Sequence, residues 1–220
     1  LSPRLRNIAA KYPVKVVHRT FVLQRNRREM IERFGSLSQA KKEILQHWAQ
    51  CQRYAEQPEL INIERMQEAK FEYPSGYLAA LYAKAIEQLR GQQAHWDFFD
   101  AVQRAHLYEA QNISDAQVLN QIAKAQGVSH LDLIATLYSP EVKQAIINDK
   151  SRAANFGIQT IPSLVINGKN VISQTLSQEQ LEQLICTQIA NQKEEANERS
   201  ARCFIANSQC RAICGHKPMG

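Results

Sequence analysis

The sequence predicts an α/β fold in which a small sheet accompanies a large set of helices. Two short apolar runs, Ser163–Ile166 and Val171–Ile172, are separated by Asn167-Gly168. Asn-Gly between two such runs is the strongest short-range signal of a β-hairpin, because both turn positions need φ > 0. Val14–Leu23 is rich in β-branched residues, which favours a further strand. The rest of the chain carries capped apolar patterns with helical spacing.

The N-terminal segment predicts one helix followed by a buried strand. Ser2-Pro3 has the form of an N-cap with proline at the first helical position, and the helix should run to about Lys11. Pro13 then ends the helical pattern. The strand predicted for Val14–Leu23 follows directly.

The next part of the chain predicts two helices and a loop. Arg25–Arg33 reads as a short basic helix that is broken by Gly35. Ser36-Leu-Ser-Gln39 has capping-box spacing and should start a second helix that runs to about Cys51. Between Cys51 and Ile63 we expect a loop with at most one helical turn.

The central part predicts the longest helix. Phe71-Glu-Tyr-Pro74 leads into it, and Gly91 closes it. Its wide apolar face would consist of Leu78, Leu81, Tyr82, Ala85, Ile86 and Leu89. The helix after Gly91 carries five large apolar residues that should form core, namely Trp96, Phe98, Phe99, Val102 and Leu107.

Four further signals complete the helical pattern. Ser114-Asp-Ala-Gln117 is a second capping box, whose helix should stop at Gly127. Leu131–Leu137 predicts a short helix. Ser139-Pro140 repeats the cap-plus-proline opening of a helix that ends at Phe156, before Gly157. Ser177-Gln-Glu-Gln180 should cap the last helix.

Thr160-Ile161-Pro162 lies between the glycine-terminated helix and the hairpin. A proline cannot donate to a sheet ladder, so Pro162 fits a strand start, and the residues alone leave the isomer of the Ile161–Pro162 bond open. The order of these elements resembles the second half of a thioredoxin fold, which has a helix, Thr-Ile-Pro, an Asn-Gly hairpin and a closing helix in the same sequence. More narrowly, residues 1–185 resemble the DsbA-type thiol-disulfide oxidoreductases, including the FrnE-like and 2-hydroxychromene-2-carboxylate isomerase branches.

The resemblance implies a thioredoxin-like sheet with an inserted all-helical domain. Residues 1–24 and 138–190 would form the thioredoxin-like domain, whose first strand would lie upstream of Leu1. Residues 25–137 would form the helical insert. Residues 191–220 would form a polar C-terminal tail that contains cysteines.

The resemblance also implies the site. The family's Cys-x-x-Cys lies at the start of the first helix, where the helix dipole favours a thiolate. No Cys-x-x-Cys occurs in the 220 residues, so no catalytic residue is predicted within the chain and the pair is expected just before Leu1. Thr160, Ile161 and Pro162 would form the cis-proline loop that docks an extended substrate.

The sequence contains five cysteines, an odd number without a dense framework, which favours a reducing cytoplasm. Cys203, Cys210 and Cys214 share one stripe if their segment is helical, and they are candidate auxiliary thiols. Unpaired thiols, a redox role and zinc binding with His216 all stay open, although the spacing is unlike that of zinc knuckles. Cys51 and Cys186 fall on apolar helical faces and predict buried core thiols.

Other functional classes find little support. The net charge of +6 is local rather than a sustained basic stripe with aromatics, so we expect no nucleic-acid partner. No apolar run approaches the roughly 20 residues of a membrane span. No glycine-rich phosphate loop and no His-Glu-x-x-His motif occurs, and neither a cofactor nor a metal is predicted. His18 could face a redox site, but local motif support is absent and a core histidine is the simpler interpretation.

The sequence therefore predicts a DsbA-type thiol-disulfide oxidoreductase or isomerase acting on a protein thiol or disulfide, or on a small thiol. Two alternatives stay open. One is a non-redox adapter of thioredoxin fold that binds a regulatory protein, and the other is a glutathione-dependent isomerase. The oligomeric state is open as well.

Overall fold

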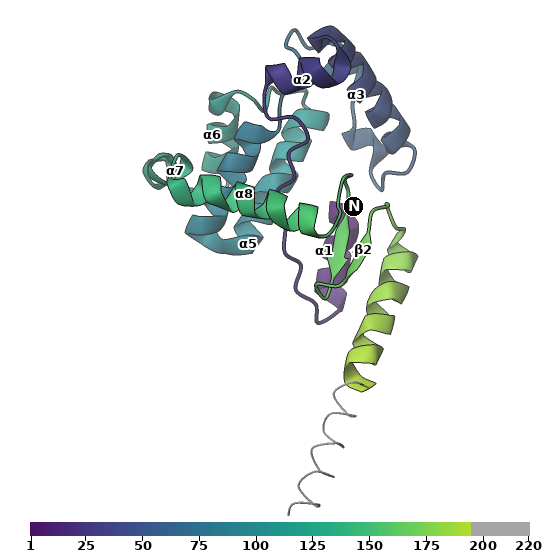
Figure 1. Cartoon of the computed structure of the whole chain (residues 1–220). Coiled ribbons are helices and arrows are strands. Elements are labelled where there is room, and N and C mark those ends of the chain that lie inside the picture. Colours follow the sequence, from purple (N-terminus) through teal and green to yellow (C-terminus); the bar gives the residue numbers. More distant parts are fainter. Residues whose placement is uncertain (195–220) are drawn as a thin grey trace, which may run out of the picture. The chain divides into compact units, whose positions relative to one another are not determined.

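The computed structural model describes residues 1–194 (Figure 1). They fall into two compact units. The larger comprises Leu1–Pro3 and Lys15–Thr175, and the smaller comprises Arg4–Val14 with the described residues from Leu176 onward. Cys203, Cys210, Cys214 and His216 lie outside the described residues. The domain boundaries expected from the sequence stay a prediction.

The larger unit is mostly helical and ends in a β-hairpin. In chain order, its elements are α2 (Arg27–Phe34), α3 (Leu37–Gln52), a 3₁₀ turn (Pro58–Leu60), α4 (Ile63–Glu68), α5 (Tyr77–Leu107), α6 (Ala116–Ala125), α7 (His130–Leu137), α8 (Pro140–Asn155), β1 (Leu164–Ile166) and β2 (Asn170–Ile172). The helix α4 was not predicted. None of the helices in residues 1–194 combines the length and apolar character that a bilayer crossing requires.

Polar side chains start the helices, as the sequence predicts. The Ser36 hydroxyl accepts from the backbone N–H of Gln39 at α3, and the Ser139 hydroxyl accepts from Val142 at α8. The predicted cap at Ser114 is wrong by one residue. Asp115 caps α6 instead, while the Ser114 hydroxyl donates to the carbonyl of Ser75. The Ser114 hydroxyl therefore makes a tertiary hydrogen bond instead of capping α6.

The helix α5 packs against α6, α7 and α8 and forms the centre of the larger unit (Figure 1). It is interrupted at Gly91, where φ is 82° and ψ is −177°, so the predicted break is confirmed. The buried core gathers around it and includes Leu81, Tyr82, Ala85, Ile86, Phe98, Val102, Leu119, Leu133, Leu137 and Val142. Leu89 and Phe99, which the sequence places in the core, are instead exposed by 39% and 37%.

The strand predicted for Val14–Leu23 is absent. The segment is extended, and its side chains alternate between half-buried and exposed from Val14 to Thr20. Two of its backbone N–H groups donate to side chains rather than to a neighbouring strand. His18 N–H donates to the Gln92 amide oxygen at 2.9 Å, and Thr20 N–H donates to the Asp149 carboxylate at 2.9 Å. The segment is extended, as a strand would be, but its hydrogen-bond partners are side chains of two helices.

The smaller unit packs most of α1 (Ser2–Lys11) against the helix of residues 178–194. Ile8 and Leu181 are both buried there. The Arg4 guanidinium, also buried, donates to the carbonyl of Leu176 at 2.6 Å. The predicted capping box at residues 177–180 is confirmed in both directions. Gln180 N–H donates to the Ser177 hydroxyl, and Ser177 N–H donates to the Gln180 amide oxygen.

Candidate functional site

The candidate site is the loop that joins α8 to the hairpin. The helix ends in a paired motif at Gly157, whose φ is 67°. Gly157 N–H donates to the carbonyl of Ala154, and Ile158 N–H donates to that of Ala153, each at 2.9 Å. These two bonds satisfy carbonyls that the end of a helix otherwise leaves without partners. The chain is thereby turned out of the helix and into the loop.

The hairpin supports the other side of this loop. Leu164 pairs with Ile172, and Val165 pairs with Val171, in antiparallel register. Asn167 and Gly168 both have positive φ, at 53° and 68°, which confirms the predicted Asn-Gly turn. The loop is therefore anchored at both of its ends by local structure that the sequence encodes.

Thr160, Ile161 and Pro162 lie together in this loop, and all three are exposed. The Ile161–Pro162 peptide bond is cis, as the family resemblance implies. Ile161 keeps 51% of its surface accessible although it is a large apolar residue. Pro162 has no N–H, and neither Thr160 nor Ile161 carries an ionisable side chain. The loop can therefore offer backbone hydrogen bonds, the Thr160 hydroxyl and an apolar contact, but no ionisable acid or base.

Two serines next to the loop were missed by the sequence analysis. The Ser163 hydroxyl donates to the carbonyl of Thr160 at 2.7 Å, and it lies 2.9 Å from the Ser173 hydroxyl. Serines at strand ends are common and carry no motif of their own. The register of the turn places the two serines opposite each other across the hairpin, and this placement is the sequence signal that could have predicted their contact.

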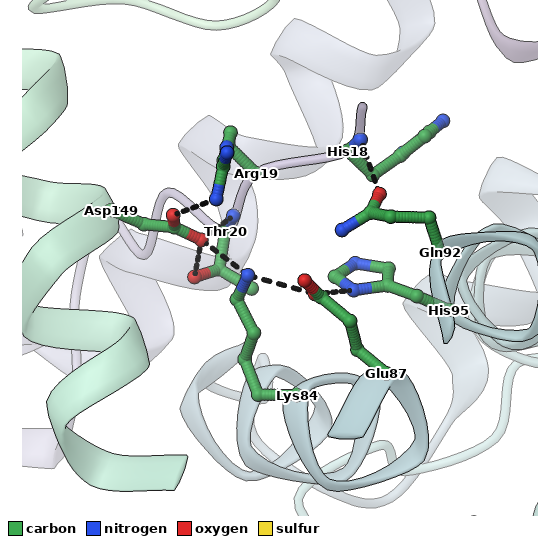
Figure 2. A network of polar contacts seen from close by, with 8 residues as sticks. All are labelled: His18, Arg19, Thr20, Lys84, Glu87, Gln92, His95 and Asp149. Atoms are coloured by element: carbon green, nitrogen blue, oxygen red, sulfur yellow. Dashed lines mark hydrogen bonds and ion pairs between the residues drawn. The ribbon is translucent and has the colours of Figure 1, made fainter. Parts of the chain in front are cut away.

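A second polar cluster lies where α5, α8 and the extended segment meet (Figure 2). The Lys84 ammonium lies 2.7 Å from the Asp149 carboxylate and 2.8 Å from the Glu87 carboxylate. The Nδ1 atom of His95 lies 2.6 Å from Glu87. The Thr20 hydroxyl also donates to Asp149, at 3.1 Å. These contacts attach the extended segment to two helices.

The charges of this cluster are mutually satisfied. Burial raises the pKa of the Glu87 carboxyl, but hydrogen bonds from His95 and Lys84 outweigh it and lower that pKa to about 2. Because Lys84 is almost fully buried between two carboxylates, its amine is not available as a nucleophile. We interpret the cluster as structural: it holds the extended segment against α5 and α8.

His18 lies in the same region, and its imidazole ring packs against aromatic rings. Its centroid lies 4.6 Å from that of Trp96 and 5.6 Å from that of Phe99. Trp96 in turn donates its indole N–H to the Ser2 hydroxyl at 2.7 Å, and Ser2 donates to Asp100 at 2.5 Å. Ser2, at the start of α1, is thus held by the second half of α5.

The two described cysteines correct the sequence analysis. Cys51 and Cys186 were expected to be buried core thiols, but Cys51 is half-buried and Cys186 is exposed. Each is a free thiol. Cys51 lies one turn from His47 on α3, with 3.5 Å between Sγ and Nε2. Within residues 1–194, His, Cys, Asp and Glu side chains nowhere gather in a group of three or more that could hold a metal ion.

Comparisons with known proteins identify one family and one fold. The model of a family described as Thioredoxin matches residues 23–188. A crystal structure from Nitrosomonas europaea, assigned provisionally as a protein disulfide isomerase, is 22% identical with a TM-score of 0.67. The match covers 86% of this chain and 90% of that one. At this identity the likeness establishes the fold, so the predicted α/β class, a thioredoxin-like sheet with inserted helices, is confirmed.

A second structure overlaps only partly. The cytosolic disulfide reductase DsbM from Pseudomonas aeruginosa is 21% identical over 48% of this chain and 51% of that one, with a TM-score of 0.37. An overlap of this extent says nothing about the function of this chain.

Proposed function

Because the chain belongs to the thioredoxin family, we propose that it serves thiol-disulfide exchange by docking an extended, cysteine-containing peptide at Thr160–Pro162. The observation that carries the proposal is the exposed loop itself, which is held between a capped helix and a hairpin and which presents backbone groups to solvent. An extended peptide can add to such a backbone as a strand would, through main-chain hydrogen bonds. The exposed Ile161 side chain adds an apolar contact.

The exchange reaction itself needs a thiolate. A thiolate attacks one sulfur of a disulfide, a mixed disulfide forms, and the other sulfur leaves as a thiolate, so no external electron carrier is consumed. The paired cysteines that the family uses for this step do not occur as Cys-x-x-Cys among these 220 residues. The part of the function that we assign to the described residues is therefore docking.

A non-redox adapter is the second candidate, and the missing Cys-x-x-Cys is the observation that favours it. Both candidates use the same docking loop, but only the first needs a reactive thiol pair. We keep the cytoplasm as the proposed compartment, because Cys51 and Cys186 are free thiols and reducing conditions preserve such thiols.

Docking can be tested by nuclear magnetic resonance on the full chain under reducing conditions. The probe is a short peptide with Val-Cys-Val at its centre, and the same peptide with Val-Ser-Val is the control for the thiol. We expect both peptides to shift the amide signals of Thr160, Ile161 and Ser163. Asn167 and Gly168, at the far end of the hairpin, should stay unchanged. Binding that leaves the loop signals unmoved, or no binding at millimolar peptide, would refute the proposal.

Activity separates the two candidates. We expect this polypeptide to show no insulin reduction, since its sequence contains no Cys-x-x-Cys pair. Insulin reduction that disappears in Cys210→Ser would instead make the C-terminal cysteines the redox site.

A further inference from the structure

A cleft of about 460 Å³ lies between α6 and α7 in the larger unit. Pockets for small molecules span about 300–1,000 Å³, so this cleft is large enough for an organic molecule. Its floor is apolar, because Ala123, Val128 and Leu133 line it and are all buried. The cleft shares no residue with the Thr160–Pro162 loop or with the polar cluster around Lys84.

The turn between the two helices holds this floor in place. Gly127 N–H donates to the carbonyl of Lys124 at 2.9 Å. Val128 N–H donates to the carbonyl of Ala123 at 3.0 Å. Gly127 has a φ of 71°, the left-handed conformation that this paired helix end favours. The Ser129 hydroxyl then caps α7, so both helix ends are fixed by local hydrogen bonds and the cleft is formed without a ligand.

The polar residues that line the cleft carry positive charge and hydrogen-bond donors. Lys124, His130 and Gln121 are exposed. Lys124 forms no ion pair within residues 1–194, and His130 has at least one ring N–H to donate. Among the described residues that line the cleft, none is acidic. The charge of the lining therefore favours an anion.

Tyr82 orients a fourth polar residue of the lining, Asn120. The Tyr82 hydroxyl donates to the Asn120 amide oxygen at 3.0 Å, and Tyr82 is only 1% exposed. Burial raises the pKa of Tyr82, so the phenol keeps its proton at neutral pH and remains the donor. Because the amide oxygen of Asn120 accepts this bond, its NH₂ group is the part that can donate to a ligand.

We propose that this cleft binds an organic anion that consists of a carboxylate on an apolar body. The apolar body lies on the buried floor, and the carboxylate is bound by Lys124 and His130. The donors of Asn120 and Gln121 complete the polar side. This site goes beyond the proposed docking function and does not depend on it.

The binding test uses naphthaleneacetate, a carboxylate on an apolar double ring. Its matched control is naphthaleneacetamide, which has nearly the same shape but no charge. Each compound is titrated into the full chain at neutral pH and low salt, and the amide signals are followed by nuclear magnetic resonance. We expect the signals of Ala123, Val128 and Leu133 to shift, while that of Gly157 stays unchanged. The carboxylate should bind about fivefold more tightly than the amide, since hydrogen bonds to charged groups are the stronger ones.

Substitutions then test the charge. Lys124→Gln should reduce the affinity for naphthaleneacetate by about fivefold and leave that for naphthaleneacetamide unchanged. Lys124→Arg, which keeps the charge, should retain most of the affinity. The matched control is Lys143→Gln, which removes an exposed lysine of α8 that does not line the cleft. All three positions of change are exposed, and amide signals outside the cleft verify that each variant is folded.

Two results would overturn the inference. Equal affinities for the two compounds, or equal losses in Lys124→Gln and Lys143→Gln, would show that the cleft does not recognise an anion. Signal shifts confined to residues outside the cleft, or no binding at millimolar naphthaleneacetate, would show that it is not a site for such molecules. Neither result bears on the docking function, because the cleft and the Thr160–Pro162 loop have no residue in common.

Discussion

The Lys84 ammonium lies 2.7 Å from the Asp149 carboxylate, and each side chain is only 3% exposed. Asp149 also accepts the Thr20 N–H, so this ion pair connects α5 and α8 to the extended segment (Figure 2). Two buried charges of this kind compensate each other's desolvation. Without Lys84, the only cation left on Asp149 within the described residues is the half-exposed Arg19 guanidinium, at 3.2 Å.

Lys84→Met should therefore destabilise the protein strongly. We expect the free energy of unfolding to fall by about 3 kcal/mol, because Asp149 keeps its charge in a buried position without its ammonium partner. Urea unfolding measures the change. The matched control is Arg28→Met, which breaks the Arg28–Glu32 pair, whose side chains are 87% and 58% exposed. That loss should stay within about 0.5 kcal/mol. Equal effects of the two substitutions would contradict the structural role of the buried pair.

Gly157 should resist replacement by alanine. Its φ of 67° lies in the left-handed region, which an L-residue with a Cβ enters at a cost of about 1 kcal/mol. No atom lies within 4 Å of an added Cβ, so the loss would come from backbone strain alone. Gly157→Asn should lose less, since asparagine tolerates this region better. Urea unfolding of both variants is the measurement, and an alanine variant as stable as wild type would show that the helix end can rearrange.

The candidate loop was predictable because its signals are local. Asn167-Gly168, Pro162 and the glycine at the end of α8 each act through backbone conformation, and each lies where the sequence predicts. Their order led to the DsbA-like thioredoxin-fold family, a recognition that the family match and the similar structure confirm.

The errors came from tertiary partners that no short pattern reveals. The β-branched residues of Val14–Leu23 correctly predict an extended chain, but a strand also needs a neighbouring strand, and here Gln92 and Asp149 take that place. The apolar setting of Cys186 on its helix likewise predicts burial, yet nothing in the sequence states which helix faces are covered. Sequence patterns predict the conformation of a single element, whereas the contacts between elements are known only from the structure.

The two described thiols should differ in reactivity. Burial raises the pKa of the Cys51 thiol, which lowers its thiolate fraction at neutral pH, whereas Cys186 is exposed. We expect Cys186 to be alkylated about tenfold faster in the folded protein. Brief treatment with iodoacetamide followed by peptide mass spectrometry gives both rates in one sample. In urea the two rates should converge, and a persistent difference there would mean that the fold is not its cause.

His106 should make the stability depend on pH. Trp48 donates its indole N–H to the Tyr73 oxygen at 2.8 Å, and that oxygen lies 3.0 Å from Nε2 of His106. The Nδ1 atom lies 3.3 Å from the carbonyl of Gln111, which can only accept. His106 therefore carries its proton on Nδ1, and Tyr73 donates to Nε2. Both nitrogens are in use in the neutral ring, so a second proton would disrupt the bond from Tyr73.

Burial lowers the pKa of His106 to about 4, although the bond to Gln111 opposes the change. In the unfolded chain the ordinary value is about 6.5. The unfolded state therefore takes up the proton first as the pH falls. The contribution to stability is fully present above about pH 6.5, is lost progressively between about 6.5 and 4, and reaches a loss of about 3 kcal/mol below both values.

His106→Gln removes this titration while keeping a side chain that can meet Tyr73. We expect the variant to be less stable than wild type at pH 7, and the difference in the free energy of unfolding should shrink by about 3 kcal/mol as the pH falls below 4. Urea unfolding across this range measures it, and the ring signals of His106 followed by nuclear magnetic resonance give the pKa directly. A stability difference that stays constant with pH, or a ring that titrates near 6.5, would show that His106 is accessible to protons in the folded protein.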